Sequence, residues 1–233
     1  MHLNSRFSQW SLLTSVAAVA LVTLALGWPR LLASIRFLPV ERTIADYHAE
    51  REIPSHRMQT LAGFAHEAID LHDHYRYHDG LSFLQYLRGL DIYTPARERR
   101  DAYRQAEAAA IETVRRAPAQ PEAWLRIATV RAVLRDEPGD VLEPWRMSVF
   151  TGRTHSTLLA PRVGLALPYV EFMDGETRSM LRDQLLLAWQ LKPRELAAEF
   201  RQRDPGLDRT RVLIDETDPE ALSEMEAQLE KAR

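Results

Sequence analysis

The hydrophobic positions divide this chain into an apolar segment near the amino terminus and a longer, periodic region behind it. Between Arg6 and Arg30 lie 23 consecutive residues without a formal charge, and their apolar centre runs from Ser11 to Trp28. At about 1.5 Å per helical residue, the uncharged stretch covers about 35 Å, whereas the hydrocarbon core of a bilayer is about 30 Å thick. The pattern therefore predicts a transmembrane anchor within residues 1–30.

The ends of this segment suggest how it sits in a membrane. Trp10 and Trp28 flank it, where indole rings favour the lipid–water interface, and Pro29 is expected to end the regular helix. A cleaved secretory signal is the alternative, because Ala25 and Gly27 form a small-x-small site. We favour a retained anchor, because the apolar centre is longer than the usual signal core of about 7 to 15 residues.

The charges around the segment give conflicting signals about its orientation. Arg6 precedes it, whereas Arg30, Arg36 and Arg42 follow it, and the excess of cations favours a cytoplasmic carboxyl side. A short tail ahead of a single span nevertheless favours export of the following domain, which is the orientation we expect. The apolar stretch from Leu31 to Val40 is short and interrupted by Arg36 and Pro39, so we expect residues 31–54 to form an interfacial juxtamembrane segment and not a second span.

Beyond Pro54 the apolar residues recur every three or four positions, and no convincing alternating pattern of a strand is present. This periodicity predicts an all-α protein whose helices each bury one face. The residues expected on the buried faces are Met58, Leu61, Ala65, Ala68, Ile69, Tyr77, Leu81, Leu84, Leu87, Ala106, Ala110, Ile111, Val114, Trp124, Ile127, Ala128, Val130, Leu134, Val141, Trp145, Val149, Phe150, residues 165–172, Met180, Leu181, Leu185, Ala188, Trp189 and Leu191.

Prolines and glycines separate these helices at regular intervals. They are Pro95, Pro118, Pro121, Pro138, Gly139, Gly152, Pro161, Gly175 (after Asp174) and Pro193. Helices of about 10 to 20 residues joined by short turns become antiparallel neighbours, and a single pair is too thin to bury both faces. Residues 55–203 are therefore predicted to form a helical-repeat domain, an α-solenoid in which helix pairs stack.

One stretch has the spacing of a known repeat. It comprises Ala106, Ala110, Val114, Pro118, Pro121, Trp124, Ile127 and Ala128. These residues resemble the tetratricopeptide repeat (TPR), in which small residues end one helix, a proline closes the repeat and a tryptophan opens the next helix. Arg131 stands where the repeat usually has an aromatic residue, and beyond Gly139 the period of about 34 residues is lost.

The chain also resembles a narrower family, on the Tyr77-His78 pair and its leucines, the segment from Ala106 to Trp124, and the helix pair from Pro161 to Leu191. The family is that of proteobacterial membrane-anchored proteins with degenerate TPR-like repeats, encoded with exopolysaccharide biosynthesis machinery (the Vibrio-polysaccharide P-type proteins). The resemblance implies a single-pass protein of the bacterial inner membrane with a periplasmic helical domain. It also implies a protein partner in a membrane complex and supplies no catalytic residue.

The carboxyl-terminal tail, residues 204–233, is acidic, with nine acidic and four basic residues. Asp204-Pro205-Gly206 predicts a break, and residues 212–214 predict a short apolar tether. The segment from Thr217 to Glu220 has the cap, proline and acids of a helix start. The narrow stripe Leu222, Met225 and Leu229 leaves open whether this helix caps the domain or binds a partner.

Composition narrows the possible chemistry further. The chain has no cysteine, which excludes disulfides, iron–sulfur clusters, thiol catalysis and cysteine-ligated zinc. A net charge of −3 gives no indication of nucleic-acid binding. No glycine-rich phosphate loop, nucleophile elbow or carboxylate pair of defined geometry is evident, so we expect neither a cofactor nor catalysis.

The densest group of titratable residues lies between Asp70 and Asp79. Within it, His74 and His78 are four residues apart and could share a helix face as weak candidate ligands for zinc or nickel, whereas His72 could not join them. A solvated turn is the expected structure there. Nearby, His66 and Glu67 begin a zinc-protease motif, but Asp70 replaces its second histidine.

The sequence therefore predicts a non-catalytic, membrane-anchored scaffold, expected in envelope polysaccharide biosynthesis or export. It would recognise a peptide or helix of a protein partner along a concave surface of stacked helices. An adaptor in cytochrome maturation or another envelope assembly shares this layout and stays an alternative. A metal-dependent enzyme centred on the His72–His78 cluster is a second alternative, from a different functional class.

Overall fold

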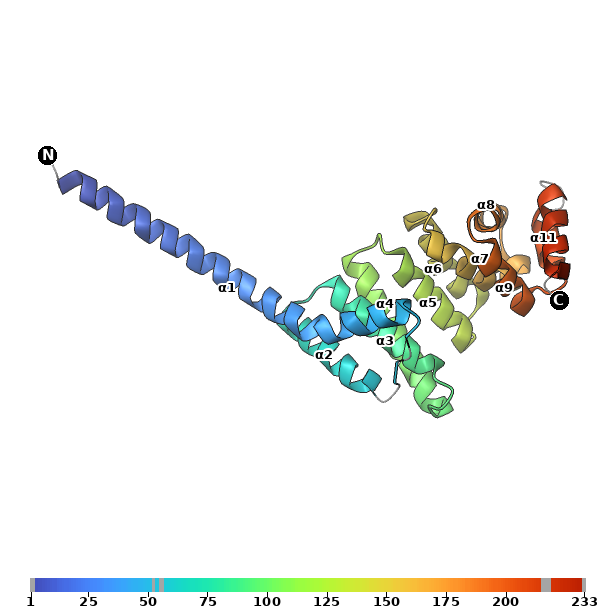
Figure 1. The fold of residues 1–233 in the computed structure, drawn as a ribbon, viewed down its shortest axis with the longest axis horizontal. Helices are drawn as coiled ribbons and strands as arrows, with labels where there is room; N and C mark the ends of the chain where they lie inside the picture. The colour runs from blue at the N-terminus through green and yellow to red at the C-terminus, as the bar shows by residue number, and fades with distance from the viewer. Residues whose placement is uncertain (1–2, 52, 55–56, 215–218, 232–233) are drawn as a thin grey trace. The chain divides into compact units, whose positions relative to one another are not determined.

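The computed structural model describes residues 3–51, 53–54, 57–214 and 219–231, and throughout these residues the regular structure is helical (Figure 1). The all-α prediction is therefore confirmed for the described part of the chain. In chain order the elements are α1 (Leu3–His48), α2 (Arg57–Leu71), α3 (Tyr75–Leu90), α4 (Ala96–Arg116), α5 (Pro121–Leu134), α6 (Pro138–Thr151), η1 (Ser156–Leu158), α7 (Leu159–Ala166), η2 (Leu167–Phe172), α8 (Gly175–Leu191), α9 (Pro193–Arg203), α10 (Asp208–Ile214) and α11 (Pro219–Lys231).

The chain forms two compact units, unit 1 (residues 1–84) and unit 2 (residues 85–233), and the boundary between them falls within α3. In unit 1, α1 from Thr14 to His48 is long and apolar enough to cross a bilayer. Only 6% of its most apolar window is buried, so this part of α1 is not the core helix of a globular domain.

The prediction that Pro29 ends the first helix is wrong, because α1 continues through Pro29 and Pro39 to His48. A proline removes one backbone donor, but packing beyond it can hold the helix together. Downstream of Pro29, Ala33 and Phe37 are fully buried and fix α1 within unit 1.

The core of unit 1 includes part of the predicted juxtamembrane segment. Phe37 lies against Tyr77 of α3 with ring centroids 4.9 Å apart, and a Cβ atom at Gly80 would overlap the Phe37 ring. Val40 is also fully buried. The structure thus differs from the expected separate interfacial segment at residues 31–54, because one face of this stretch belongs to the core.

In unit 2, α4 and α5 pack against each other. Ala110 and Val114 of α4 contact Ala123 and Ile127 of α5 in one hydrophobic cluster. The small alanines allow close approach of the two helices. Trp124, at the start of α5, is half-buried and its indole N–H donates to the Pro118 carbonyl at 2.8 Å.

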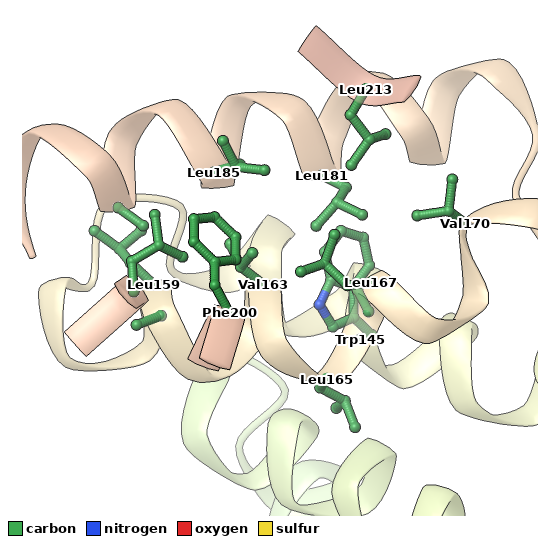
Figure 2. Close-up of a cluster of buried hydrophobic side chains, with 14 of the residues drawn as sticks. Trp145, Leu159, Val163, Leu165, Leu167, Val170, Leu181, Leu185, Phe200 and Leu213 are labelled. Carbon is green, nitrogen blue, oxygen red and sulfur yellow. The ribbon is translucent and has the colours of Figure 1, made fainter. Parts of the chain in front are cut away.

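The next part of unit 2 departs from a series of stacked pairs. Seven of the eight residues of α7 are buried, and this short helix lies within a large hydrophobic cluster shared with α8 and α9 (Figure 2). Residues 165–172, expected on one buried face, are divided between α7 and the 3₁₀ turn η2. Trp145 is fully buried, but Phe150, Phe172 and Leu191 are exposed, contrary to their predicted core positions.

The same cluster extends into the acidic carboxyl-terminal segment beyond residue 203. Its members there are Leu207, Leu213, Ile214, Leu222 and Met225. Asp204 is buried and accepts hydrogen bonds from Thr210 at its backbone N–H (2.9 Å) and its hydroxyl (2.8 Å). The predicted break at Asp204 is confirmed, because α9 ends at Arg203 and α10 begins at Asp208, with the buried Asp204 side chain bound to the first turn of α10. The cap predicted at residues 217–218 lies outside the described residues.

Candidate functional site

A candidate binding surface of unit 2 lies between the end of α6, the turn after it, and α8. Two adjoining cavities of about 370 and 270 Å³ share Arg153 and Asp183, and together they define the α6–α8 groove. The first cavity is lined by Arg153, Thr154, Asp183, Leu186, Leu187 and Gln190, and the second by Val149, Phe150, Arg153, Glu176, Met180, Asp183 and Gln184.

One face of α8 forms the floor of the groove. Its residues Glu176, Met180, Asp183, Leu187 and Gln190 follow one another at intervals of four and three, which places them along one helix face. This series extends over about 21 Å at a rise of about 1.5 Å per residue. A single helix or an extended peptide of a partner fits a floor of this length.

The apolar lining of the groove is partly open to solvent. Phe150, at the end of α6, exposes 65% of its surface although it follows the buried Val149 directly. Met180, Leu186 and Leu187 are half-buried beside it. Exposed aromatic residues next to half-buried aliphatic ones are typical anchors of protein–protein contacts.

The charges around the groove are matched in pairs. Arg153 binds Asp183 at 2.7 Å, and Arg146 of α6 binds Glu176 at 3.3 Å. Exposed ion pairs of this kind contribute little to folding, and either member can exchange its partner for a charge on a bound peptide. The groove therefore combines apolar contact area with charges that can set the register of a ligand.

A buried arginine lies beneath the groove. Arg162 of α7 is fully buried, and its Nε donates to Ser148 Oγ at 3.0 Å while Nη1 donates to the Gly152 carbonyl at 2.8 Å. Ser148 and Gly152 belong to the carboxyl-terminal end of α6, where carbonyls lack helical partners and the helix dipole is negative. Burial lowers the pKa of Arg162 to about 10, so the guanidinium is still charged at neutral pH.

The same arginine helps to connect α8, the floor of the groove, to the turn after α6. Arg162 Nη1 donates to Gln184 Oε1 at 3.1 Å, and Gln184 Nε2 donates to the Arg153 carbonyl at 3.0 Å. Gln184 is itself buried and lines the second cavity. This network holds the turn that carries Arg153 against α8. Because Arg153 lines both cavities, the network also helps to maintain their shape.

Close backbone packing holds the other side of that turn. A Cβ atom at Gly152 would lie 2.8 Å from Pro121 Cγ, so glycine is required where the end of α6 meets the start of α5. Ser148 Oγ, which accepts from Arg162, donates to the Pro121 carbonyl at 2.7 Å. The start of α5, the end of α6 and Arg162 of α7 are thus connected through a few polar groups.

The two candidate metal ligands have different hydrogen-bond partners. His78 of α3 is buried and its Nε2 lies 2.7 Å from Asp73 Oδ1. His74 instead accepts a hydrogen bond at Nδ1 from the Arg76 backbone N–H at 3.3 Å, and its pKa is lowered by burial and by the nearby His72. In the part of the chain that the structure describes, no three histidine or acidic side chains converge as a metal site would require.

The histidines and the neighbouring Glu67 lie on or between α2 and α3 of unit 1. Residues 72–74 form the connection between α2 and α3, as the predicted turn requires, but His78 lies inside α3 and not in the turn. Glu67, the acidic residue of the incomplete protease motif, forms an ion pair with Arg36 of α1 at 3.6 Å. The side chains of the cluster therefore pair with neighbours in unit 1.

Sequence reasoning did not identify the groove residues. The hydrophobic pattern predicts a core position for Phe150 because it continues an apolar run, although it is one position, or about 100°, beyond the face of Trp145 and Val149. Arg162 is the single charge in the otherwise uncharged segment from Thr154 to Val170 if His155 is counted as neutral. That isolated charge was the one available signal of a buried polar network.

No protein-family model matches this chain, and the comparison with curated proteins gives no match either. The groove geometry and the family resemblance of the sequence are therefore the two supports for a functional proposal.

Proposed function

We propose that the protein is a membrane-anchored, non-catalytic scaffold whose unit 2 binds a segment of a partner protein in the α6–α8 groove. The observation that carries the proposal is the pair of adjoining cavities along one face of α8. Their charged residues are paired with one another, and exposed Phe150 offers an aromatic anchor. These features support binding of a helix or extended peptide.

In this proposal α1 is retained as a single-pass anchor in a bacterial inner membrane, with the helical units on the periplasmic side. The helix continues without a break through Ala25 and Gly27, where a signal sequence would be cleaved. Beyond that site its residues Ala33 and Phe37 are buried in unit 1, which favours retention of the whole helix. The anchor would confine the search for a partner to the membrane.

The packing of α4 against α5 supports a TPR-like arrangement in this part of unit 2. Arg131, which departs from the repeat pattern, donates from Nε to Glu107 Oε1 at 2.6 Å and thereby connects α5 to α4. A polar contact thus replaces the aromatic packing of the usual repeat. In our proposal the repeat-like helices support the groove, and α7 to α9 complete it.

The pathway in which the scaffold acts is proposed from the resemblance of the sequence to exopolysaccharide-associated membrane proteins. We place it in assembly or export of an envelope polysaccharide. An adaptor in cytochrome maturation would use the same anchor and groove, so the identity of the partner decides between the two. No contact among the described residues favours the metal-dependent enzyme centred on His74 and His78.

The proposal is tested by a photo-crosslinking residue placed at Phe150 in the full-length chain, in the cells that produce it. Phe172 is the matched control, because it is equally exposed (63% against 65%) and does not line either cavity. We expect a discrete crosslinked protein from position 150 that is absent or several-fold weaker from position 172. The replacements Phe150→Ala and Met180→Ala should reduce polysaccharide export, and Phe172→Ala should not.

Two results would contradict the proposal in different ways. Equal crosslinking at both positions would show that the groove is not a specific binding site. A crosslinked protein that belongs to cytochrome maturation would retain the scaffold function and overturn the polysaccharide pathway.

A further inference from the structure

The part of α1 that follows Pro29 has one covered and one open face. Leu31, Ile35 and Leu38 expose 53, 51 and 42% of their surface. On the opposite side of the same helix turns, Ala33 and Phe37 are buried in unit 1. An apolar stripe is thus left outside unit 1, on the side away from its core.

This stripe continues a regular series that begins inside the predicted membrane span. The exposed apolar residues of the series are Leu21, Leu24, Trp28, Leu31, Ile35 and Leu38. Their separations alternate between three and four residues, the spacing of the contact seam between two supercoiled helices. Arg42 occupies the next position and is exposed, so the seam ends at Leu38 after about 26 Å.

Lipid cannot cover the whole series if α1 spans the membrane as proposed above, on which this inference rests. The uncharged stretch that ends at Pro29 is already about 35 Å long as a helix and fills the hydrocarbon core. Because α1 continues unbroken past Pro29, it carries Leu31, Ile35 and Leu38 beyond that core instead of turning along the surface. An apolar seam in that position requires a protein surface.

We infer that α1 pairs in parallel with α1 of a second copy of this chain along the Leu21–Leu38 seam. A single span gives every copy the same orientation, so each seam residue meets its own counterpart at the same depth. Arg42, at the position after Leu38, would face its like-charged counterpart, so we place the end of the pairing at Leu38. Arg36 lies off the seam and binds Glu67 of its own unit at 3.6 Å. The scaffold would thereby present two grooves from one membrane site.

Cysteine crosslinking tests this geometry directly, because the chain contains no natural cysteine. The full-length protein in lipid vesicles carries Leu31→Cys, Ile35→Cys or Leu38→Cys on the seam. Arg30→Cys and Arg36→Cys serve as controls on the same exposed helix turns. We expect the yield of disulfide-linked dimer to be at least several-fold higher at the three seam positions. Equal yields, or a maximum at a control position, would overturn the inference.

A second measurement is independent of disulfide chemistry. Energy transfer between donor- and acceptor-labelled copies is followed at high lipid dilution for Ile35→Arg and for Thr60→Arg, which adds the same charge at an exposed position of α2. Ile35 faces away from the core, so both variants should retain their helical circular-dichroism spectrum. We expect transfer to be lost only with Ile35→Arg. Unchanged transfer in that variant would contradict a seam through this residue.

The two proposals fail in distinguishable ways. If alkaline carbonate extracts the full chain from vesicles, the membrane anchor itself is wrong. If the chain stays inserted but gives neither crosslinks nor energy transfer, only the pairing is wrong. Quenching of labels at the seam cysteines by spin-labelled lipid headgroups, without dimer formation, would assign the stripe to lipid and also overturn the pairing.

Discussion

Arg162 and Ser148 are joined by a buried hydrogen bond from the guanidinium Nε to the hydroxyl oxygen, 3.0 Å long, between α7 and α6. The same Ser148 hydroxyl donates to the Pro121 carbonyl of α5 at 2.7 Å and so links α6 to α5. The acceptors of Arg162 given by the structure are uncharged oxygens, and those on the backbone belong to the end of α6. The cation thus stabilises a helix terminus as well as the turn beside the groove.

Replacing Arg162 is expected to destabilise unit 2 strongly. Arg162→Met keeps most of the side-chain volume but leaves the Gly152 carbonyl and Gln184 Oε1 without their donor, at a cost of about 2 to 5 kcal/mol in all. Urea unfolding of the full chain in detergent micelles, followed by circular dichroism, measures this change. The control Arg153→Met removes an exposed ion pair and should cost less than about 1 kcal/mol. Equal losses would contradict the buried network.

The contact of Gly152 with Pro121 gives a second stability prediction. In Gly152→Ala the new methyl group would lie 2.8 Å from Pro121 Cγ, and the resulting overpacking should cost about 1 to 3 kcal/mol. Gly139, in the first turn of α6, has no atom within 4 Å of an added Cβ. Gly139→Ala should therefore be neutral or stabilising by up to about 1 kcal/mol. A thermal melt of both variants separates the two outcomes.

The pairing of His78 with Asp73 leads to a prediction about metal binding. One ring nitrogen of each histidine is already engaged, and no three histidine or acidic side chains converge among the described residues. We expect the full chain, after dialysis against Zn²⁺ or Ni²⁺ and removal of free ion, to retain no stoichiometric metal by atomic emission. The double variant His74→Gln with His78→Gln should behave identically. One ion per chain, lost in the double variant, would instead favour the metal-dependent enzyme.

The helical class and much of the core follow from local sequence patterns. Leu61, Ala65 and Leu84 are buried as their spacing of three and four residues predicts. The first helix shows the limit of such reasoning, since Pro29 is a strong local signal for a helix end. The buried contact of Phe37 with Tyr77, which is distant in sequence, outweighs that signal. Tertiary contacts of this kind are not visible in a local window.

The candidate site was less predictable for a related reason. A groove forms where neighbouring helices leave part of their surfaces uncovered. The hydrophobic pattern shows which residues are apolar but not which of them a neighbouring helix covers. Phe150 and Val149 are adjacent and both apolar, yet one lines the groove and the other is buried in the core. The buried Arg162 is equally hidden, because its partners include main-chain carbonyls that no side-chain motif can mark.

The pH dependence of stability should expose the unusual position of Glu199 in α9. Burial raises the pKa of its carboxyl above the ordinary 4.5, although Arg203 lies only 3.4 Å away. The folded state therefore holds this proton more tightly than the unfolded state, and stability falls as pH rises from 4.5 through the raised pKa. Glu199→Gln removes this loss, so the variant should match the natural chain near pH 4 and become more stable than it near pH 7.

Glu195, one turn earlier in α9, provides the matched control with the opposite sign. A hydrogen bond from its own backbone N–H and the side chain of Lys192 lower the pKa of the Glu195 carboxyl. Its ionised form is favoured in the folded state, so it adds stability above pH 4.5 that is lost on acidification through the lowered pKa. Glu195→Gln should therefore be less stable than the natural chain at neutral pH. Urea midpoints between pH 4 and 8 test both variants, and slopes of the same sign would contradict the assigned burial of Glu199.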